Sequence, residues 1–225
     1  MPILEDAKRT IERVTGYRRP DATDLGLLTQ DRKAHLLRFK DDGETPNNSR
    51  LAMILYRSAV RLPDRFDPAA VFEDLFATNG WEDSWRDGMY DFLHFHTHTH
   101  EVLGIARGSV RAEFGGTDGK TLDLKAGDVV ILPAGTGHRR LKASKDLLIV
   151  GAYPANGGKY DEPKPEDVSH KAALTSIARV RVPRADPIYG KNGPMKRYWG
   201  ARRKSMDENR IGGLECKHRS ALPPA

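Results

Sequence analysis

The sequence predicts an all-β domain, an antiparallel barrel or sandwich, with additions at both ends. Between residues 81 and 153, short runs rich in Val, Ile, Leu and aromatic residues alternate with glycine-containing turns at regular intervals. The chain has 225 residues, of which 38% are apolar and 30% charged, and this suits one large β domain with additions. The segments outside residues 81–153 are too thin to bury a second core.

Residues 1–79 are expected to form helices and strands that pack on the barrel. Apolar residues recur at helical spacing over residues 4–14, which predicts a short amphipathic helix. Runs rich in strand formers occupy residues 35–39 and 51–56, and the segment between them, 41–48, has the composition of a loop.

A further helix is expected to begin at Asp67-Pro68 and to end near Gly80, since Asp is a good N-cap and Pro suits the first helical position. The barrel itself is assigned to residues 80–153. Its strands are expected at 101–106, 110–114, 122–124, 129–132 and 147–152.

The last segment, residues 154–225, is predicted to be a loop-rich basic extension with one strand at 177–182. From Ile177 to the end it carries 12 Lys/Arg and 4 Asp/Glu, a balance of +8 in a chain with a net charge of +6. The run Arg202-Arg203-Lys204 is typical of a solvated tail, or of a rim that attracts anionic ligands. No zinc-finger spacing or P-loop accompanies it, so no nucleic-acid partner is expected.

The sequence also carries expectations about location. No apolar run is long enough to span a membrane, and the N-terminus lacks the basic and apolar regions of a signal peptide. The single cysteine, Cys216, cannot form an internal disulfide and has no evident base beside it to make it a nucleophile. These observations predict a cytoplasmic protein.

Half of the eight histidines lie within seven residues, at His94, His96, His98 and His100, directly before Glu101. On a strand, His94 and His96 would project from the same face. Glu101 would return on the following strand, opposite them. A tight glycine-rich turn precedes His138, which could bring a third imidazole to the same place. Three imidazoles and a carboxylate suit Fe, Mn, Ni or Zn, so one divalent metal ion per chain is expected.

The spacing of these residues resembles the two motifs of the cupin superfamily, the RmlC-like jelly rolls. The first motif is matched by Gly88, His94-Phe95-His96, Glu101 and Gly108. The second motif is matched by Gly127, Pro133-Ala134-Gly135 and His138. Lys142 stands where the family has Asn, which is not a metal ligand there. The resemblance implies a single cupin double-stranded β-helix, or jelly-roll barrel.

Shorter stretches extend the likeness to the YjlB-type bacterial cupins. They are Asn79-Gly80-Trp81, residues 100–104, residues 150–154 and residues 186–190. The resemblance implies that His94, His96, Glu101 and His138 are the metal ligands, and that His98 and His100 lie in the turn between the ligand strands. His100 has three open interpretations: an additional ligand, a residue that supports a ligand by hydrogen bonding, or a solvated turn histidine.

Residues near the motifs are candidates for the pocket wall. They are Tyr90, Phe92, Trp81, Trp85 and Arg140. Tyr90 and Phe92 are separated from His94 by an even number of residues, so on a strand they would point to the same face. The two tryptophans fit either the hydrophobic core or the pocket wall. Arg139, Arg140 and Lys142 form a solvated rim, or one or two of them reach the mouth and hold an anionic substrate.

The resemblance implies a metal-dependent enzyme acting on a small molecule, by a dioxygenase-like or an isomerase- or epimerase-like reaction. Glu101 is the candidate catalytic base. The alternative is a non-catalytic cupin that binds or senses a small molecule. A homodimer joined through sheet edges is the expected assembly, since such pairing protects the edges.

Overall fold

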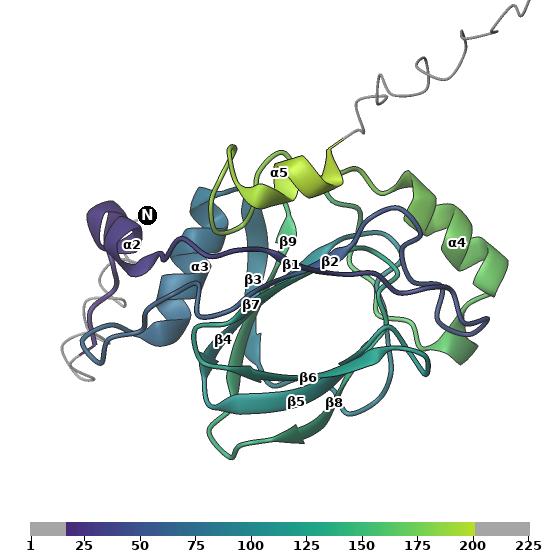
Figure 1. Cartoon of the computed structure of the whole chain (residues 1–225), viewed down its shortest axis with the longest axis horizontal. Coiled ribbons are helices and arrows are strands. Elements are labelled where there is room, and N and C mark those ends of the chain that lie inside the picture. The colour runs from purple at the N-terminus through teal and green to yellow at the C-terminus, as the bar shows by residue number, and fades with distance from the viewer. Residues whose placement is uncertain (1–16, 201–225) are drawn as a thin grey trace, which may run out of the picture.

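The computed structural model describes residues 17–200, and its centre is a jelly-roll barrel of two antiparallel sheets (Figure 1). The strands are β1 (His35–Leu37), β2 (Met53–Tyr56), β3 (Trp81–Asp87), β4 (Glu101–Arg107), β5 (Ser109–Phe114), β6 (Lys120–Lys125), β7 (Val129–Leu132), β8 (His138–Ala143) and β9 (Leu148–Pro154). One sheet has the order β1-β2-β7-β4-β9-β3, and the other has the order β6-β5-β8. The predicted fold class is confirmed.

In Figure 1 helices lie to the left of, above and to the right of the barrel, and no helix of the described residues lies against the sheet of β5, β6 and β8. They are α2 (Ala22–Leu28), α3 (Pro68–Thr78), a 3-10 turn η1 (Pro165–Asp167), α4 (His170–Arg179) and α5 (Pro194–Trp199). Within residues 17–200 no helix combines the length and the apolar character that crossing a membrane requires.

The space between the two sheets is filled by apolar side chains from both. Leu103 and Ile105 of β4 point inward from the larger sheet, and Val110 and Phe114 of β5 meet them from the smaller one; all four are buried. Because strand side chains alternate, the residues between them point the other way. In β5 this leaves Arg111 exposed, which explains the alternating sequence of the smaller sheet.

The larger sheet is buried on both faces. Its outer face packs on α3 and α5, where Phe72, Phe76 and Trp199 are buried. This double burial explains why β2 and β7 are continuous apolar runs. Close packing also accounts for Gly104 in β4, since a Cβ there would lie 2.4 Å from Cδ1 of Phe72.

Several predicted elements are confirmed by local chemistry. Helix α3 begins at Pro68, and the Asp67 side chain accepts a hydrogen bond from the Ala69 N–H at 3.0 Å. Gly80 follows the helix with a φ of 75°. Strands β1 and β2 lie within the predicted runs 35–39 and 51–56. Since β2 pairs with β7, the segment 1–79 contributes strands to the large sheet itself, not only a covering layer.

The predicted strand at 177–182 is wrong, because residues 170–179 form helix α4. One face of α4 buries Ala173 and Ile177, four residues apart, against Phe95 and Ala134, while Leu174 is 38% exposed. The short apolar run was compatible with either periodicity, and tertiary packing selected the helix.

Two strands escaped prediction because they are polar. Strand β3 reads WEDSWRD and lies at an edge of the large sheet, and β8 reads HRRLKA in the small sheet. Three further sequence features lie outside the described residues: the helix expected at 4–14, the basic run 202–204 and Cys216.

Candidate metal centre

Backbone pairing brings the two predicted motifs together. The His94 N–H donates to the His138 carbonyl at 3.3 Å, and the His138 N–H donates to the His94 carbonyl at 2.9 Å. The Gly135 N–H donates to the His96 carbonyl at 2.7 Å. Residues 94–96 therefore lie extended beside the start of β8, although they make only this isolated bridge and no regular strand, contrary to the expectation.

The glycines of the second motif permit this close approach, as predicted. Gly135 has a φ of 89°, and a Cβ on it would lie 2.6 Å from the Asn47 carbonyl oxygen. A Cβ on Gly137 would lie 2.5 Å from Cγ2 of Thr45. A larger residue at either position would collide with the 45–47 segment and displace the turn that carries His138.

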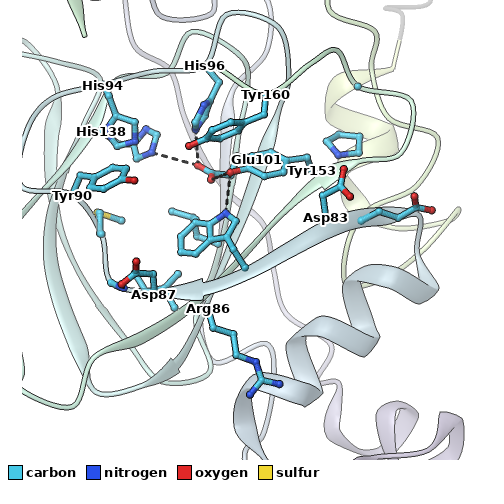
Figure 2. Close-up of a pocket in the computed structure, with 18 of the residues that line it drawn as sticks. Asp83, Arg86, Asp87, Tyr90, His94, His96, Glu101, His138, Tyr153 and Tyr160 are labelled. Atoms are coloured by element: carbon cyan, nitrogen blue, oxygen red, sulfur yellow. Dashed lines mark hydrogen bonds and ion pairs between the residues drawn. The ribbon is translucent and has the colours of Figure 1, made fainter. Parts of the chain in front are cut away.

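Three histidines converge at the inner end of this arrangement. His94, His96 and His138 each offer a ring nitrogen, and these nitrogens lie within 4.8 Å of one another. Exposure is 4%, 4% and 2%, respectively, so the cluster is nearly dehydrated. Their side chains face one another in Figure 2. His94 and His96 share one face of the extended segment, while Phe95 points oppositely into the contact with α4.

Glu101, the first residue of β4, completes the cluster. Its Oε2 atom lies 3.1 Å from Nε2 of His96 and 3.4 Å from Nε2 of His138 (Figure 2). The turn before β4 thus returns the carboxylate to face the histidines, as the sequence predicted. The carboxylate thus lies beside two of the three histidines, while the group whose ligand atoms are all within 4.8 Å of one another consists of His94, His96 and His138.

Hydrogen bonds to backbone carbonyls orient all three imidazoles. Nδ1 of His94 contacts the Phe92 carbonyl at 3.3 Å, and Nδ1 of His138 contacts the Thr136 carbonyl at 3.0 Å. Nδ1 of His96 contacts the Asp161 carbonyl. A carbonyl can only accept, so each Nδ1 carries the proton and each Nε2 is directed to the cluster. Metal-binding histidines are commonly held in this way.

Burial and neighbouring charges set the protonation of the cluster. Burial, followed by the nearby His138 and His96, lowers the pKa of His94 to about 3, so this imidazole is neutral. Burial alone would raise the pKa of Glu101, but His96 and His138 hold it well below its usual range. Burial opposes the charged form of His96, but the neighbouring Glu101 raises its pKa. A divalent cation needs neutral imidazole and ionised carboxylate, so it would displace a proton from His96 on binding. The residues present therefore fit a metal ion.

Tyr153 on β9 holds the other oxygen of Glu101. The Tyr153 hydroxyl donates to Oε1 of Glu101 at 3.1 Å and accepts from the Trp85 indole N–H at 2.9 Å (Figure 2). Burial, and then the charge of Glu101, raises the pKa of Tyr153, so the hydroxyl keeps its proton. Sequence reasoning missed this role, because it depends on how β9 pairs with β3 and β4, which local spacing does not reveal.

Asp161 was also missed. Its carboxylate accepts from the Thr97 N–H at 3.0 Å and the Thr97 hydroxyl at 2.6 Å, while its carbonyl contacts His96. It lies 65 residues beyond His96, in a segment without regular structure, so no spacing rule indicated it.

A cavity of about 760 Å³ opens from the cluster to the surface. Besides the cluster, it is lined by Glu82, Asp83, Trp85, Arg86, Asp87, Gly88, Met89, Tyr90, Asp91, Leu103, Arg140, Ile149, Tyr153, Pro154, Ala155, Gly157, Gly158 and Tyr160. Its size is typical of pockets that hold a small molecule.

Comparison with known proteins identifies the family. No family model matches the chain. The chain is 32% identical over 169 residues to the uncharacterized protein YjlB of Bacillus subtilis, and the match covers 75% of this chain and 98% of that protein. The chain belongs to the YjlB family. Together with the jelly-roll barrel and both motifs, this supports membership of the cupin superfamily, while the finer RmlC-like label stays a prediction.

Solved structures resemble this YjlB-family chain only weakly. A Bacillus subtilis oxalate decarboxylase variant matches with a TM-score of 0.31 and 18% identity, over 52% of this chain and 29% of that one. The 11S globulin of Wrightia tinctoria matches with a TM-score of 0.31 and 14% identity, over 41% of this chain and 29% of that one. The chain thus spans under a third of these structures, and likeness at this level does not bear on the reaction.

The two remaining clustered histidines lie outside the metal centre of this YjlB-family chain. His98 is exposed, and its Nδ1 lies 3.2 Å from Oδ2 of Asp161. His100 is 1% exposed, so it is not a solvated turn histidine. Its Nδ1 accepts from the Ala134 N–H at 2.9 Å, and its ring lies 4.9 Å from that of Trp199. The described contacts of His100 are thus structural and do not reach the three-histidine group.

Three other candidates are resolved by the structure. Tyr90 and Arg140 line the cavity, as predicted, but Phe92 does not. Phe92 stacks on Tyr90 with ring centroids 4.7 Å apart and faces a separate surface hollow with Lys164. The loop between residues 88 and 93 is irregular, so its side chains do not alternate as on a strand. The even spacing between Phe92 and His94 therefore does not place the Phe92 side chain on the same face. Of the two tryptophans, Trp81 lies in the hydrophobic core and Trp85 lines the cavity.

Proposed function

We propose that this YjlB-family protein is a metal-dependent enzyme that acts on a small molecule. One observation carries the proposal: three imidazole Nε2 atoms and a carboxylate converge at the closed end of a cavity large enough for a substrate. His94, His96, Glu101 and His138 would hold one divalent ion of Fe, Mn, Ni or Zn. When bound, such an ion supplies Lewis-acid or redox chemistry to a substrate that reaches its open coordination positions.

The chain's own residues prepare this site in two ways. Carbonyls fix the three imidazoles, so that little reorganisation is needed when a cation or substrate arrives. Tyr153 donates a hydrogen bond to Oε1 of Glu101, and Oε2 of Glu101 faces the histidines. Glu101 is the candidate acid–base residue, since it is the carboxylate nearest to the cluster and lines the cavity.

Two reaction classes fit these residues. A dioxygenase-like reaction would need room for a substrate beside the metal, and the cavity provides that room. An isomerase- or epimerase-like reaction would need a group that moves a proton, and Glu101 with its Tyr153 partner meets that need. Both classes remain proposals on the same site.

Metal content is the first test of this proposal. Protein purified without added metal is analysed for elements, alongside His96→Ala, His138→Ala and the matched control His98→Ala. We expect about one metal ion per chain in the wild type and in His98→Ala, because His98 is exposed and outside the cluster. We expect little or none in the other two variants. Equal metal in all four proteins would show that the histidine cluster is not the site.

Reactivity is the second test. Oxygen uptake over thiols, diketones and phenols, and NMR-detected isomerisation of sugar acids, separate the two reaction classes. Turnover lost in His138→Ala supports an enzyme. If the metal-loaded protein binds compounds from the panel and turns over none of them, the alternative of a non-catalytic binding or sensing cupin replaces this proposal.

A further inference from the structure

We propose that the cavity accepts a small molecule that carries an alkylammonium group, held by carboxylates and aromatic rings at the mouth. The inference rests on the proposed function, since the other end of the same molecule would meet the metal centre. It concerns which substrates the site selects, a property that the metal ligands alone leave open.

The charged lining of the cavity is acidic once internal ion pairs are considered. Away from the cluster, the charged residues are Glu82, Asp83, Asp87, Asp91, Arg86 and Arg140. Arg86 is withdrawn: its guanidinium donates to Glu73 at 2.6 and 2.7 Å and to Asp67 at 2.8 Å. Figure 2 shows the Arg86 side chain extending away from the cluster, toward the helix beside β3. Its charge is therefore satisfied outside the cavity.

Arg140 is partly neutralised as well. Its Nη2 atom lies 3.5 Å from Oδ2 of Asp91. Three carboxylates of the lining, those of Glu82, Asp83 and Asp87, then have no ion-pair partner among residues 17–200. Within the described part of the chain, the Asp87 carboxylate accepts only from the neighbouring Gly88 N–H, at 2.6 Å. The expected anionic substrate finds little support in this lining, whereas a cation would meet unbalanced negative charge.

Aromatic rings occupy the space between these carboxylates and the cluster. Tyr90, Tyr153 and Tyr160 lie around the cavity in the close-up (Figure 2), and Trp85 also lines it. Tyr90 is 47% exposed and Tyr160 is 45% exposed, so their rings remain accessible. Aromatic faces attract organic cations through the ring quadrupole, and the attraction strengthens as the cation loses water.

The negative potential also extends over the Tyr90 ring. The nearby Glu162, then burial, then Asp87 raise the pKa of Tyr90. The Tyr160 hydroxyl donates to the same Glu162 carboxylate. Glu162 does not itself line the cavity, but its charge lies beside two of the lining rings and adds to the negative potential there.

The inner end of the cavity leads to the candidate metal centre. His94 is 4% exposed and lines the cavity, yet its Nε2 atom makes no hydrogen bond to any residue that the structure describes. In the proposed metal site this nitrogen holds the ion, so the inner end of a substrate would meet the metal beside His94. A molecule with a donor oxygen at one end and an ammonium group at the other matches both ends of the cavity.

Three probes of nearly equal shape test the charge preference. They are choline, the neutral isostere 3,3-dimethylbutan-1-ol and the anion 3,3-dimethylbutanoate, each titrated calorimetrically into metal-loaded protein. We expect choline to bind about tenfold more tightly than the alcohol. We expect the anion to bind no better than the alcohol, and the advantage of choline to shrink as salt rises.

Variants assign the preference to the cavity. Asp87→Asn retains an acceptor for the Gly88 N–H but removes the charge. It should weaken choline about fivefold and leave the alcohol unchanged. Asp118→Asn, on the exposed β5–β6 turn and outside the cavity lining, should change neither affinity. Tyr90→Leu should reduce choline binding more than alcohol binding.

The outcomes separate this inference from the proposed function. Absent choline binding, equal choline and alcohol affinities, tighter binding of the anion, or an unchanged preference in Asp87→Asn would each overturn the inference. Metal content is measured on the same samples. Metal present without a cation preference overturns only this inference, whereas a cation preference in protein that takes up no metal overturns only the metal-dependent enzyme.

Discussion

The Tyr153 hydroxyl donates to one oxygen of Glu101, while the other oxygen of Glu101 faces His96 and His138. Three separate strands meet in this contact, because Tyr153 lies on β9, Glu101 on β4 and the Trp85 indole that supports Tyr153 on β3. Tyr153 and Trp85, two residues of the larger sheet that lie outside both sequence motifs, thereby position the Glu101 carboxylate.

Removal of the Tyr153 hydroxyl should weaken metal binding. Tyr153→Phe keeps the ring but leaves Oε1 of Glu101 and the Trp85 N–H without their partner. Loss of a residue that orients a metal ligand typically lowers affinity by about 10- to 100-fold. Competition with a chelator measures the effect. Tyr160→Phe is the matched control, since its hydroxyl contacts Glu162 rather than Glu101; equal losses in both variants would contradict the prediction.

Metal should stabilise the fold through the histidine cluster. The cluster joins the 94–96 segment, β4 and β8, so a cation bound there ties together parts that separate on unfolding. At free metal about 100-fold above Kd, the free energy of unfolding should rise by about 2.7 kcal/mol. Urea denaturation with and without a chelator measures this rise. It should vanish in His96→Ala and persist in His98→Ala.

Gly151→Ala should destabilise the protein and disturb the cavity wall. A Cβ on Gly151 would lie 2.1 Å from Cε2 of Trp85, so the indole would have to move and leave Tyr153. Overpacking of this kind costs about 1–3 kcal/mol. Gly26→Ala on α2, where a Cβ would meet nothing within 4 Å, should be neutral or slightly stabilising. Urea midpoints and tryptophan fluorescence compare the two, and similar midpoints would count against the packing argument.

Asp186→Ala should detach the segment that carries α5. The Asp186 carboxylate is fully buried and accepts from the Tyr56 hydroxyl at 2.5 Å and from the Met195 N–H at 3.1 Å. It also accepts from the Ile188 N–H at 2.9 Å. Buried donors left unpaired cost about 1–3 kcal/mol each, so the variant should lose at least about 2 kcal/mol of unfolding free energy. Tyr56→Phe removes one donor to Asp186 but keeps the Asp186 carboxylate and its backbone donors, and should lose only about 1 kcal/mol. A larger loss in Tyr56→Phe would refute this account of the network.

The predicted barrel strands agree with the structure, and the residues predicted as ligands lie close together in it, for reasons that are local in the chain. Apolar runs such as 129–132 reveal strands directly, because both faces of the large sheet are buried. The spacing from His94 to Glu101 and the glycines before His138 reflect short turns whose geometry depends on neighbouring residues. The strand expected at 177–182 was wrong because so short an apolar run fits helix and strand alike.

By itself, the sequence determined the fold class and the four residues of the candidate centre. Side-chain periodicity and motif spacing depend only on residues that lie near one another in the chain. Only the tertiary structure decided that His100 packs on Trp199 and that Asp161 and Tyr153 support the cluster. It also decided that Arg86 turns away and leaves the mouth acidic. These relationships join residues far apart in the chain, and side-chain direction in an irregular loop or at a sheet edge depends on neighbours that folding alone supplies.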